Sequence, residues 1–416
     1  MKLMVYEHAA GGGYCDRKLT PSLFSEGYAM LNASVQDFQR VESKVYTTLD
    51  YRIANFTPPL NVEVVTILRP PQRVVEVFDR VCKEIDQIMI IAPESADTLY
   101  NLTKIAERNH LIVLGSSSEA VKVLSNKWNV KKIAENLGLN IPQIEKISFN
   151  TSIGEIKEIL DNLGYPTVLR NLDSVGGEGV LLVDSNSDLN SAVNLLKSST
   201  IHPEFIAHKY IKGIPVSVSL LSNGVTATPI SLNAQAVSFN PQSGLLDYIG
   251  GYTPLKYKIS RQVKKAALKL VENMSGVRGY IGVDFVIDES DQPFILEVNP
   301  RLTTSYIGIR RVVDVNLMDA IRKAVVEGSL PENINLKGYA FFSKVRIKVT
   351  EMLTVTKMQQ LAQISGVITP PFPTGLDYSE AVIVAEGNTL KEAQAAFQYM
   401  KRNLQSLGEV GFEEIS

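Results

Sequence analysis

The residue types with the clearest chemical potential gather in the stretch Phe294–Arg301. Phe294, Leu296 and Val298 alternate there with Ile295, Glu297 and Asn299, which is the two-residue period of a β-strand. One face of this strand is therefore predicted to be apolar, and the other to present a carboxylate and a carboxamide side by side. Arg301, which follows directly after a proline, adds a planar fork of donors that suits phosphate or carboxylate.

A second strand is predicted at Tyr280–Ile287, where Asp284 is the one formal charge. Residues 288–293 are rich in turn formers and join the two strands into a hairpin, so that Asp284, Glu297 and Asn299 would converge. Oxygen ligands of this kind suit Mg²⁺, which keeps some waters and shares its remaining positions with phosphate oxygens. A lone Glu-x-Asn is more often part of a solvated sheet face. The apolar surroundings here favour a metal-and-phosphate site instead.

Composition narrows the classes of function. The chain has 416 residues, of which 45% are hydrophobic and 21% are charged, as in a globular protein with a substantial core. Its formal net charge of -2 argues against a nucleic-acid binder that works by neutralising phosphates. Cys15 and Cys82 are the only cysteines, so no disulfide framework is implied. No segment has the length of a membrane span or the pattern of a signal peptide. We therefore expect a soluble, cytoplasmic protein without nucleic-acid or membrane partners.

The N-terminal part, residues 1–115, alternates strand and helix patterns, which predicts an open, mostly parallel α/β sheet. Ligands of such sheets lie beyond the carboxyl ends of the strands, where we expect Glu7, His8, Gly11–Gly13 and Glu94. The triple glycine lacks the spacing of a dinucleotide-binding loop, so no such site is predicted.

The next part, residues 116–203, contains a predicted helix at Lys122–Leu137 and then two strands on either side of a glycine-rich loop at 171–179. The tip of such a hairpin can cover a polyphosphate with its backbone N–H groups turned inward. A plain hairpin turn that contains glycine is the alternative.

Polar and aromatic side chains are conspicuous in residues 233–257, which show little periodicity. A long stretch of this kind inside a compact domain is usually a functional loop. Asp247, Tyr248 and Tyr252 are candidates there for binding a cationic substrate group, since a carboxylate and ring faces suit a cation. Tyrosines packed down on a surface loop are an equally consistent interpretation. Residues 332–416 then form a last unit, predicted to be a small α+β domain.

The order of these motifs resembles that of the ATP-grasp superfamily of carboxylate–amine ligases over roughly Leu124–Ile309. The resemblance implies a two-lobed core, with a small lobe at 116–203 and a large lobe at 204–331. It also implies that Lys127 contacts an ATP phosphate. Arg170 ends the strand whose usual terminal lysine binds phosphate, and the two side chains differ in reach and geometry.

The resemblance further assigns residues to the flap, the adenine hinge and the metal end of the site. The flap over the β- and γ-phosphates would consist of Gly176, Gly177, Glu178 and Gly179. The hinge that recognises adenine through its backbone would consist of His208, Lys209, Tyr210 and Ile211, where the family's common acidic side chains are missing. The metal ligands would be Asp284, Glu297 and Asn299, and the catalytic residues Arg301 and Asn299.

A narrower similarity, to the tyramine–glutamate ligases of methanofuran biosynthesis, rests on Asn299–Tyr306, Gly11–Gly13 and Ser25–Gly27. These resemblances imply an enzyme that forms an amide through an acyl phosphate from a small amino acid or amine, with glutamate and an aromatic amine as one candidate pair. The implied cofactors are ATP and Mg²⁺, with Mn²⁺ as an alternative. A homodimer is an assembly that the resemblance allows.

Two other functions stay open. A nucleotide-binding regulatory or scaffold protein with a degenerate site would fit Arg170, the missing hinge acids and the added C-terminal unit. The complete metal triad argues against it, because clustered carboxylates are costly to bury without a cation. The other alternative is a carboxylating or carbamoylating enzyme that uses bicarbonate.

Overall fold

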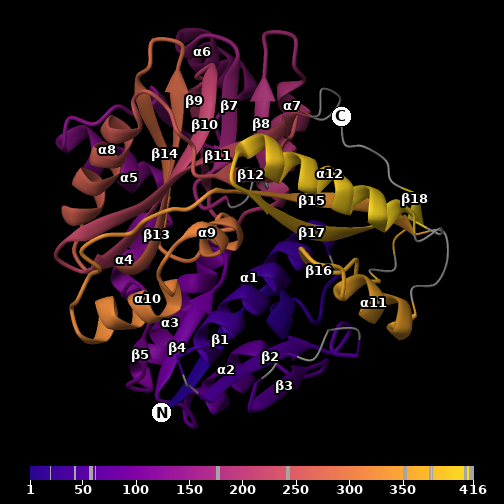
Figure 1. Cartoon of the computed structure of the whole chain (residues 1–416). Helices are drawn as coiled ribbons and strands as arrows, with labels where there is room; N and C mark the ends of the chain where they lie inside the picture. The colour runs from indigo at the N-terminus through magenta and orange to yellow at the C-terminus, as the bar shows by residue number, and fades with distance from the viewer. Residues whose placement is uncertain are drawn as a thin grey trace.

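The computed structural model describes the chain except for residues 19, 42–43, 56–59, 61, 175–178, 240–243, 350–353, 374–375, 377, 407–409 and 412–416. Its strands form three sheets (Figure 1). The N-terminal sheet lies at the bottom of the view and a small sheet at the top, while the largest sheet passes between them. Within the part of the chain that is described, no helix is both long and apolar enough to cross a membrane.

Five parallel strands in the order β3-β2-β1-β4-β5 form the N-terminal sheet. The strands are β1 (Lys2–Glu7), β2 (Lys44–Asp50), β3 (Val64–Leu68), β4 (Gln87–Ile91) and β5 (Ile112–Val113). The helices and helical turns around them are a π turn (Ala9–Gly13), α1 (Pro21–Gln39), α2 (Val74–Cys82), a 3₁₀ turn (Ser95–Asp97) and α3 (Thr98–Arg108). Strand β4 is buried at every position, as a parallel strand covered on both faces must be. The predicted open parallel sheet is confirmed.

A four-stranded antiparallel sheet in the order β6-β9-β7-β8 follows. Its strands are β6 (Ile144–Ser148), β7 (Thr167–Asn171), β8 (Val180–Val183) and β9 (Glu204–Lys209). The helices of this region are α4 (Ser118–Leu124), α5 (Lys127–Asn136), α6 (Ile153–Leu163) and α7 (Leu189–Ser198). Apolar side chains of α6 and α7 share one buried cluster with those of β7, β8 and β9, so these helices cover one face of the sheet.

The prediction of one continuous helix at Lys122–Leu137 is wrong, because α4 ends at Leu124 and α5 begins at Lys127. The side chain of Asn126 accepts a hydrogen bond from the Trp128 N–H (3.0 Å) and so caps α5. Short polar side chains compete with the helical backbone for hydrogen bonds and favour a cap over a helix interior. The break places Lys127 on the first turn of a new helix.

The largest sheet has nine strands in the order β14-β13-β10-β11-β12-β15-β17-β16, with β18 paired to β15. The strands are β10 (Gly213–Asn223), β11 (Ala227–Phe239), β12 (Leu246–Thr253), β13 (Arg278–Asp288), β14 (Pro293–Asn299), β15 (Tyr339–Val349), β16 (Val367–Thr369), β17 (Tyr378–Gly387) and β18 (Val410–Gly411). The helices are α8 (Ser260–Glu272), α9 (Tyr306–Val312), α10 (Leu317–Val326), α11 (Val355–Ala362) and α12 (Leu390–Ser406).

The prediction of a functional loop at 233–257 is also wrong, because β11 continues to Phe239 and β12 occupies Leu246–Thr253. Strand β12 pairs with β11 on one side and β15 on the other, so tertiary partners satisfy its backbone. Its two glycines allow these close approaches. A Cβ atom on Gly250 would lie 2.2 Å from the Phe342 carbonyl oxygen. The polar, glycine-rich composition of β12 is therefore the reason why this central strand was predicted to be a loop.

Pairing of β12 with β15 continues the sheet of the predicted large lobe into the C-terminal residues. The predicted boundary between residues 331 and 332 falls in the connection from α10 to β15, and the domain boundaries stay predictions. The C-terminal strands also contact α1 of the N-terminal unit. The Thr369 hydroxyl donates to the Ser25 carbonyl (2.7 Å), and the rings of Tyr28 and Phe372 meet edge to face. Helix α1 therefore packs against the C-terminal residues as well as against the N-terminal sheet.

A buried ion pair fixes α9 to α1. The Arg310 guanidinium donates two hydrogen bonds to the Asp37 carboxylate (2.7 and 2.6 Å), and each side chain is only 5% exposed. The Tyr306 hydroxyl donates to the same carboxylate. Removing one partner of such a pair leaves an uncompensated buried charge.

We therefore expect Asp37→Ala to lower the free energy of unfolding by about 3–5 kcal/mol, measured by urea unfolding. Glu386→Ala is the matched control, because Glu386 pairs with Arg311 of the same helix at 3.2 Å on the surface. The control should change stability by about 0–1 kcal/mol. Equal effects of the two substitutions would contradict the buried role of Asp37.

Candidate active site

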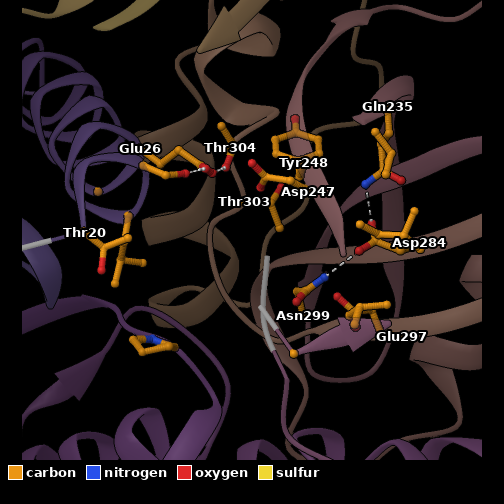
Figure 2. A pocket seen from close by; sticks show the side chains of 18 of the residues that line it. Thr20, Glu26, Gln235, Asp247, Tyr248, Asp284, Glu297, Asn299, Thr303 and Thr304 are labelled. Carbon is orange, nitrogen blue, oxygen red and sulfur yellow. Dashed lines mark hydrogen bonds between the residues drawn. The ribbon is translucent and has the colours of Figure 1, made fainter. Parts of the chain in front are cut away.

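A cavity of about 1130 Å³ lies where the N-terminal strand ends, helix α1, the large sheet and the C-terminal strands meet. Figure 2 shows side chains that line it. Asp284, Glu297 and Asn299 gather at one side of the view, and Glu26 lies at the other side beside Thr304. The cavity therefore has two chemically distinct ends.

The hairpin of β13 and β14 builds the first end. Asp284 and Glu297 are direct cross-strand partners in the antiparallel register. The Asn299 amide donates to one Asp284 oxygen (3.1 Å), and the Gln235 amide of β11 donates to the other (3.1 Å). The predicted convergence of Asp284, Glu297 and Asn299 is thus observed. Gln235 joins them from the part of β11 that falls in the stretch predicted to be a loop.

The alternation predicted for β14 is interrupted. The register shifts after the pair of Asp284 and Glu297, so that Leu296 is the extra residue on its strand. Ile295 and Val298 point into the buried core, whereas Leu296 lines the cavity beside Glu297. The prediction that Leu296 and Val298 share an apolar face is therefore wrong, and the bulge is the physical reason.

Two cations compensate Glu297. Its carboxylate accepts a short hydrogen bond from Arg170 of β7 and lies 3.4 Å from the Lys127 ammonium of α5. Burial alone would raise the pKa of Glu297, but the charges of Lys127 and Arg170 outweigh burial and lower it. Burial, followed by the charge of Glu297, raises the pKa of Asp284 well above its usual range. The hairpin therefore holds one compensated and one under-compensated carboxylate.

Further hydrogen bonds position Lys127 and a third cation, Arg301. Lys127 donates to the Ser174 carbonyl at 2.6 Å, and burial followed by the Arg170 charge lowers the pKa of its ammonium. Arg301 donates to both carboxylate oxygens of Glu94 at 3.0 Å. Glu94 follows strand β4, so the N-terminal sheet orients a side chain of the large lobe, as expected for its carboxyl edge.

The donor set of the hairpin fits Mg²⁺. Two carboxylates and a carboxamide oxygen are hard ligands, and the under-compensated charge of Asp284 is what a cation would relieve. Among the residues described, no three His, Cys, Asp or Glu side chains form a cage of their own. A partial ligand set of this kind suits a metal ion that shares its coordination with water and phosphate oxygens.

The predicted nucleotide residues are only partly placed at this cavity. Gly179 and Arg170 line it, whereas Gly176, Gly177 and Glu178 lie outside the described residues. The lining includes none of the hinge residues His208, Lys209, Tyr210 and Ile211. They lie at the end of β9 and in the connection to β10, between the small and the large sheet. Burial, followed by the Arg170 charge, lowers the pKa of His208 to about 4, which keeps its imidazole neutral at pH 7.

Of the predicted substrate residues, the structure brings Asp247 and Tyr248 to the cavity but not Tyr252. The register between β11 and β12 shifts at Ala236 and Val237, which places Tyr248 and Tyr252 on opposite faces of β12. The sequence pattern did not reveal this bulge.

Sequence reasoning missed Lys344, Arg346 and Glu380 at the second end of the cavity. Lys344 of β15 pairs with Glu26 of α1 (2.9 Å) and Asp247 of β12 (3.5 Å), and Arg346 pairs with Glu380 of β17 (3.2 Å). A signal was present in the sequence. Lys344 and Arg346 alternate with apolar residues in a strand pattern, and Glu380 directly precedes the apolar run 381–385.

Comparison with known proteins places these features in a family. The pre ATP-grasp 3 domain matches residues 43–121, and the ATP-grasp domain matches residues 124–305. A tyramine–L-glutamate ligase of Methanocaldococcus jannaschii is 26% identical over 312 residues, which make up 74% of this chain and 84% of that protein.

Solved structures share the fold at lower identity. An ATP-grasp superfamily protein of Archaeoglobus fulgidus has a TM-score of 0.61 at 22% identity, covering 92% of this chain and 99% of that chain. The biotin carboxylase domain dimer of Hydrogenobacter thermophilus 2-oxoglutarate carboxylase was solved with MgADP and bicarbonate. Its TM-score is 0.73 at 13% identity, covering 99% of this chain and 90% of that chain.

Close approach of α1 and β1 shapes the cavity wall. A Cβ atom on Gly27 would lie 2.5 Å from the Glu7 carboxylate, which is buried and accepts a hydrogen bond from the Ala10 N–H (2.6 Å). We expect Gly27→Ala to destabilise the protein by about 1–3 kcal/mol in urea unfolding, because it overpacks this contact. Gly154→Ala in α6 is the control, since nothing lies within 4 Å of its Cβ position. The control should raise the free energy of unfolding by about 0.5–1 kcal/mol. The same increase for Gly27→Ala would contradict a tight contact between Gly27 and Glu7.

Proposed function

The chain belongs to the ATP-grasp superfamily of ATP-dependent ligases that act on small substrates, and on this premise we propose that it joins a carboxyl group to an amine through an acyl phosphate. The observation that carries the proposal is the buried pair of Asp284 and Glu297, with Lys127 and Arg170 against it. Two carboxylates and two cations in one desolvated spot suit a metal–triphosphate complex.

The proposed reaction has two steps. A substrate carboxylate oxygen attacks the γ-phosphorus of ATP, and the bond to the β-phosphate oxygen breaks to release ADP. The nitrogen of the amine then attacks the acyl carbon. Phosphate leaves, and the nitrogen loses a proton to give the amide. Phosphoryl transfer needs positioning and charge neutralisation more than covalent help from the protein.

Exchange of charge partners explains how the hairpin would accept its ligands. Mg²⁺ held by Asp284, Glu297 and Asn299 would neutralise developing charge on the phosphates and orient them in line. Glu297 would then no longer need both Lys127 and Arg170, which frees two cations for the phosphate oxygens. Lys127 and Arg170 both contact Glu297 already, so the exchange of partners needs only small movements of side chains.

Arg301 and Asn299 are the proposed catalytic residues. The Arg301 guanidinium donates to Glu94 and to the Leu302 carbonyl, which fixes its plane, and its remaining N–H groups would hold the transferring phosphoryl group and the tetrahedral intermediate. The Asn299 amide donates an N–H to Asp284, and its oxygen would be the ligand for the cation. Groups fixed in this way lose little freedom when charge develops.

We propose an amino acid such as glutamate and an aromatic amine as the substrate pair. The name of the relative in Methanocaldococcus jannaschii supports glutamate and tyramine as the first pair to test. Tyr248 and Asp247 support an aromatic or cationic group in the cavity, and Leu246 and Phe239 add apolar lining. The retained charges at the hairpin argue against a degenerate, purely regulatory site.

A screen of phosphate release tests this proposal, with ATP, Mg²⁺ and a matrix of amino acids and amines that includes L-glutamate with tyramine. We expect release that requires both an acid and an amine. Glu297→Gln should reduce the rate on the order of 100-fold or more, because it removes a charge that stabilises the transition state. Glu289→Gln is the matched control, since Glu289 lies in the turn of the same hairpin with its side chain 69% exposed.

Three results would speak against the proposal. Full activity of Glu297→Gln would remove the metal assignment. Release that responds to bicarbonate rather than to an amine would favour a carboxylating enzyme. Nucleotide binding without turnover across the whole matrix would favour the scaffold protein.

A further inference from the structure

The C-terminal strands provide a charged wall at the end of the cavity away from the hairpin. Arg346 of β15 and Tyr378 and Glu380 of β17 line the cavity there. In the sheet order, β10, β11 and β12 separate this wall from the strand that carries Asp284. The wall therefore lies on other strands than the hairpin at which phosphoryl transfer is proposed.

Two buried polar atoms on this wall have no partner. Arg346 and Glu380 face each other in the register of β15 and β17, and one guanidinium nitrogen donates to one carboxylate oxygen (3.2 Å). The Nε of Arg346 and the Oε2 of Glu380 are buried and make no hydrogen bond. A buried polar atom without a partner costs about 1–3 kcal/mol, so it needs an explanation. One orphan is a donor and the other is an acceptor.

The groups that carry these atoms are held in place. The Glu380 side chain is only 3% exposed, and the Arg346 guanidinium stacks over the Tyr378 ring at 4.5 Å. Burial raises the pKa of Glu380 although Lys344 and Arg346 lie nearby, so its charge is not fully compensated. Lys344 cannot supply more, because it already contacts Glu26, Asp247 and the Ser22 hydroxyl.

We propose that Arg346 and Glu380 bind the carboxylate and the ammonium of the α-amino-acid head of one substrate. The proposal rests on the ligase function proposed above and extends it to a specific subsite. The head of an amino acid carries an acceptor for Arg346 Nε and a donor for Glu380 Oε2 on neighbouring atoms. An amino acid would thereby give a hydrogen-bond partner to both of these buried atoms.

Other ligand classes fit this wall less well. A simple amine would satisfy Glu380 but leave the donor of Arg346 unused. A phosphate would meet the carboxylates of Glu26, Asp247 and Glu380, which outnumber the cations Lys344 and Arg346. Like charges at such distances oppose binding. A zwitterion matches the mixture of charges.

A consequence for the reaction follows from this placement. The α-amino and α-carboxyl groups that bind the wall are held away from the hairpin, so they do not react. The carboxyl or amine that reacts is carried by the side chain of the amino acid. The product therefore keeps a free α-amino and a free α-carboxyl group.

The test compares L-glutamate with N-acetyl-L-glutamate and the α-amide of glutamate as acids, with tyramine as the amine, in the full-length protein. If the screen finds another amino acid, the same derivatives of that amino acid are used. Blocking either α-group should raise the KM for the acid roughly 10- to 100-fold, the value of a lost charged hydrogen bond. The KM for ATP should stay within about twofold, because the nucleotide end is untouched.

Variants assign the two groups separately. In Glu380→Gln the penalty for N-acetylation should shrink, while the penalty for the α-amide remains. In Arg346→Lys, which keeps the charge but loses the Nε donor, the reverse should hold. A purely structural role would not exchange the penalties in this way. Glu386→Gln on the same strand β17 is the control and should behave like the parent.

Failure of this inference can be told apart from failure of the ligase function. Turnover in which both blocked derivatives react as well as the free amino acid would overturn the inference alone. If no pair is turned over, calorimetric titration of the amino acids in the presence of MgADP tests the subsite directly. Binding that requires both α-groups would then support the subsite, and absence of binding would overturn it together with the ligase function.

Discussion

Two carboxylates share a buried position at the centre of this structure, and their repulsion must be balanced by positive charge. The antiparallel register makes Asp284 and Glu297 direct neighbours, and burial strengthens their interaction. Lys127 and Arg170 come from two other elements to neutralise Glu297. Among the described residues, the donors to Asp284 are the neutral amides of Gln235 and Asn299, so no cation there compensates its charge directly. We propose that a metal ion bound together with the nucleotide supplies this positive charge.

Three parts of the chain surround the cavity. The N-terminal sheet contributes Glu7 and Glu94 at the carboxyl ends of its strands, and Glu94 fixes Arg301. Helix α1 contributes Glu26, and the C-terminal strands contribute Arg346 and Glu380. Since the C-terminal strands continue the same sheet as the hairpin, the two ends of the cavity keep a fixed spacing. Under the proposed function, a hairpin that carries the chemistry and a separate wall of charges would allow specificity to vary without changing the reaction.

The sequence predicted the hairpin end of the cavity better than the other end. Alternation and one isolated charge per strand were sufficient to find Asp284, Glu297 and Asn299, because hairpin partners are close in sequence. The bulge beside Leu296 and the cap at Asn126 depend on local hydrogen bonds that hydrophobic patterns do not encode. The patterns therefore predicted a regular strand and one long helix.

Long-range partners were beyond the reach of the sequence patterns. Strand β12 looked like a loop because its glycines and polar residues are explained only by strands β11 and β15 on either side. The pair of Arg301 and Glu94 joins residues 207 positions apart, and nothing local marks either one as the partner of the other. The same holds for Lys344 and Glu26, which join the last unit to the first.

A crystal structure with Mg²⁺ and a non-hydrolysable ATP analogue would test the role of the buried carboxylates most directly. We expect Mg²⁺ bound by Asp284, Glu297 and Asn299, with Lys127 and Arg170 moved from Glu297 to phosphate oxygens. An analogue bound without metal at the hairpin, with Glu297 still paired to Arg170, would contradict this explanation of the site.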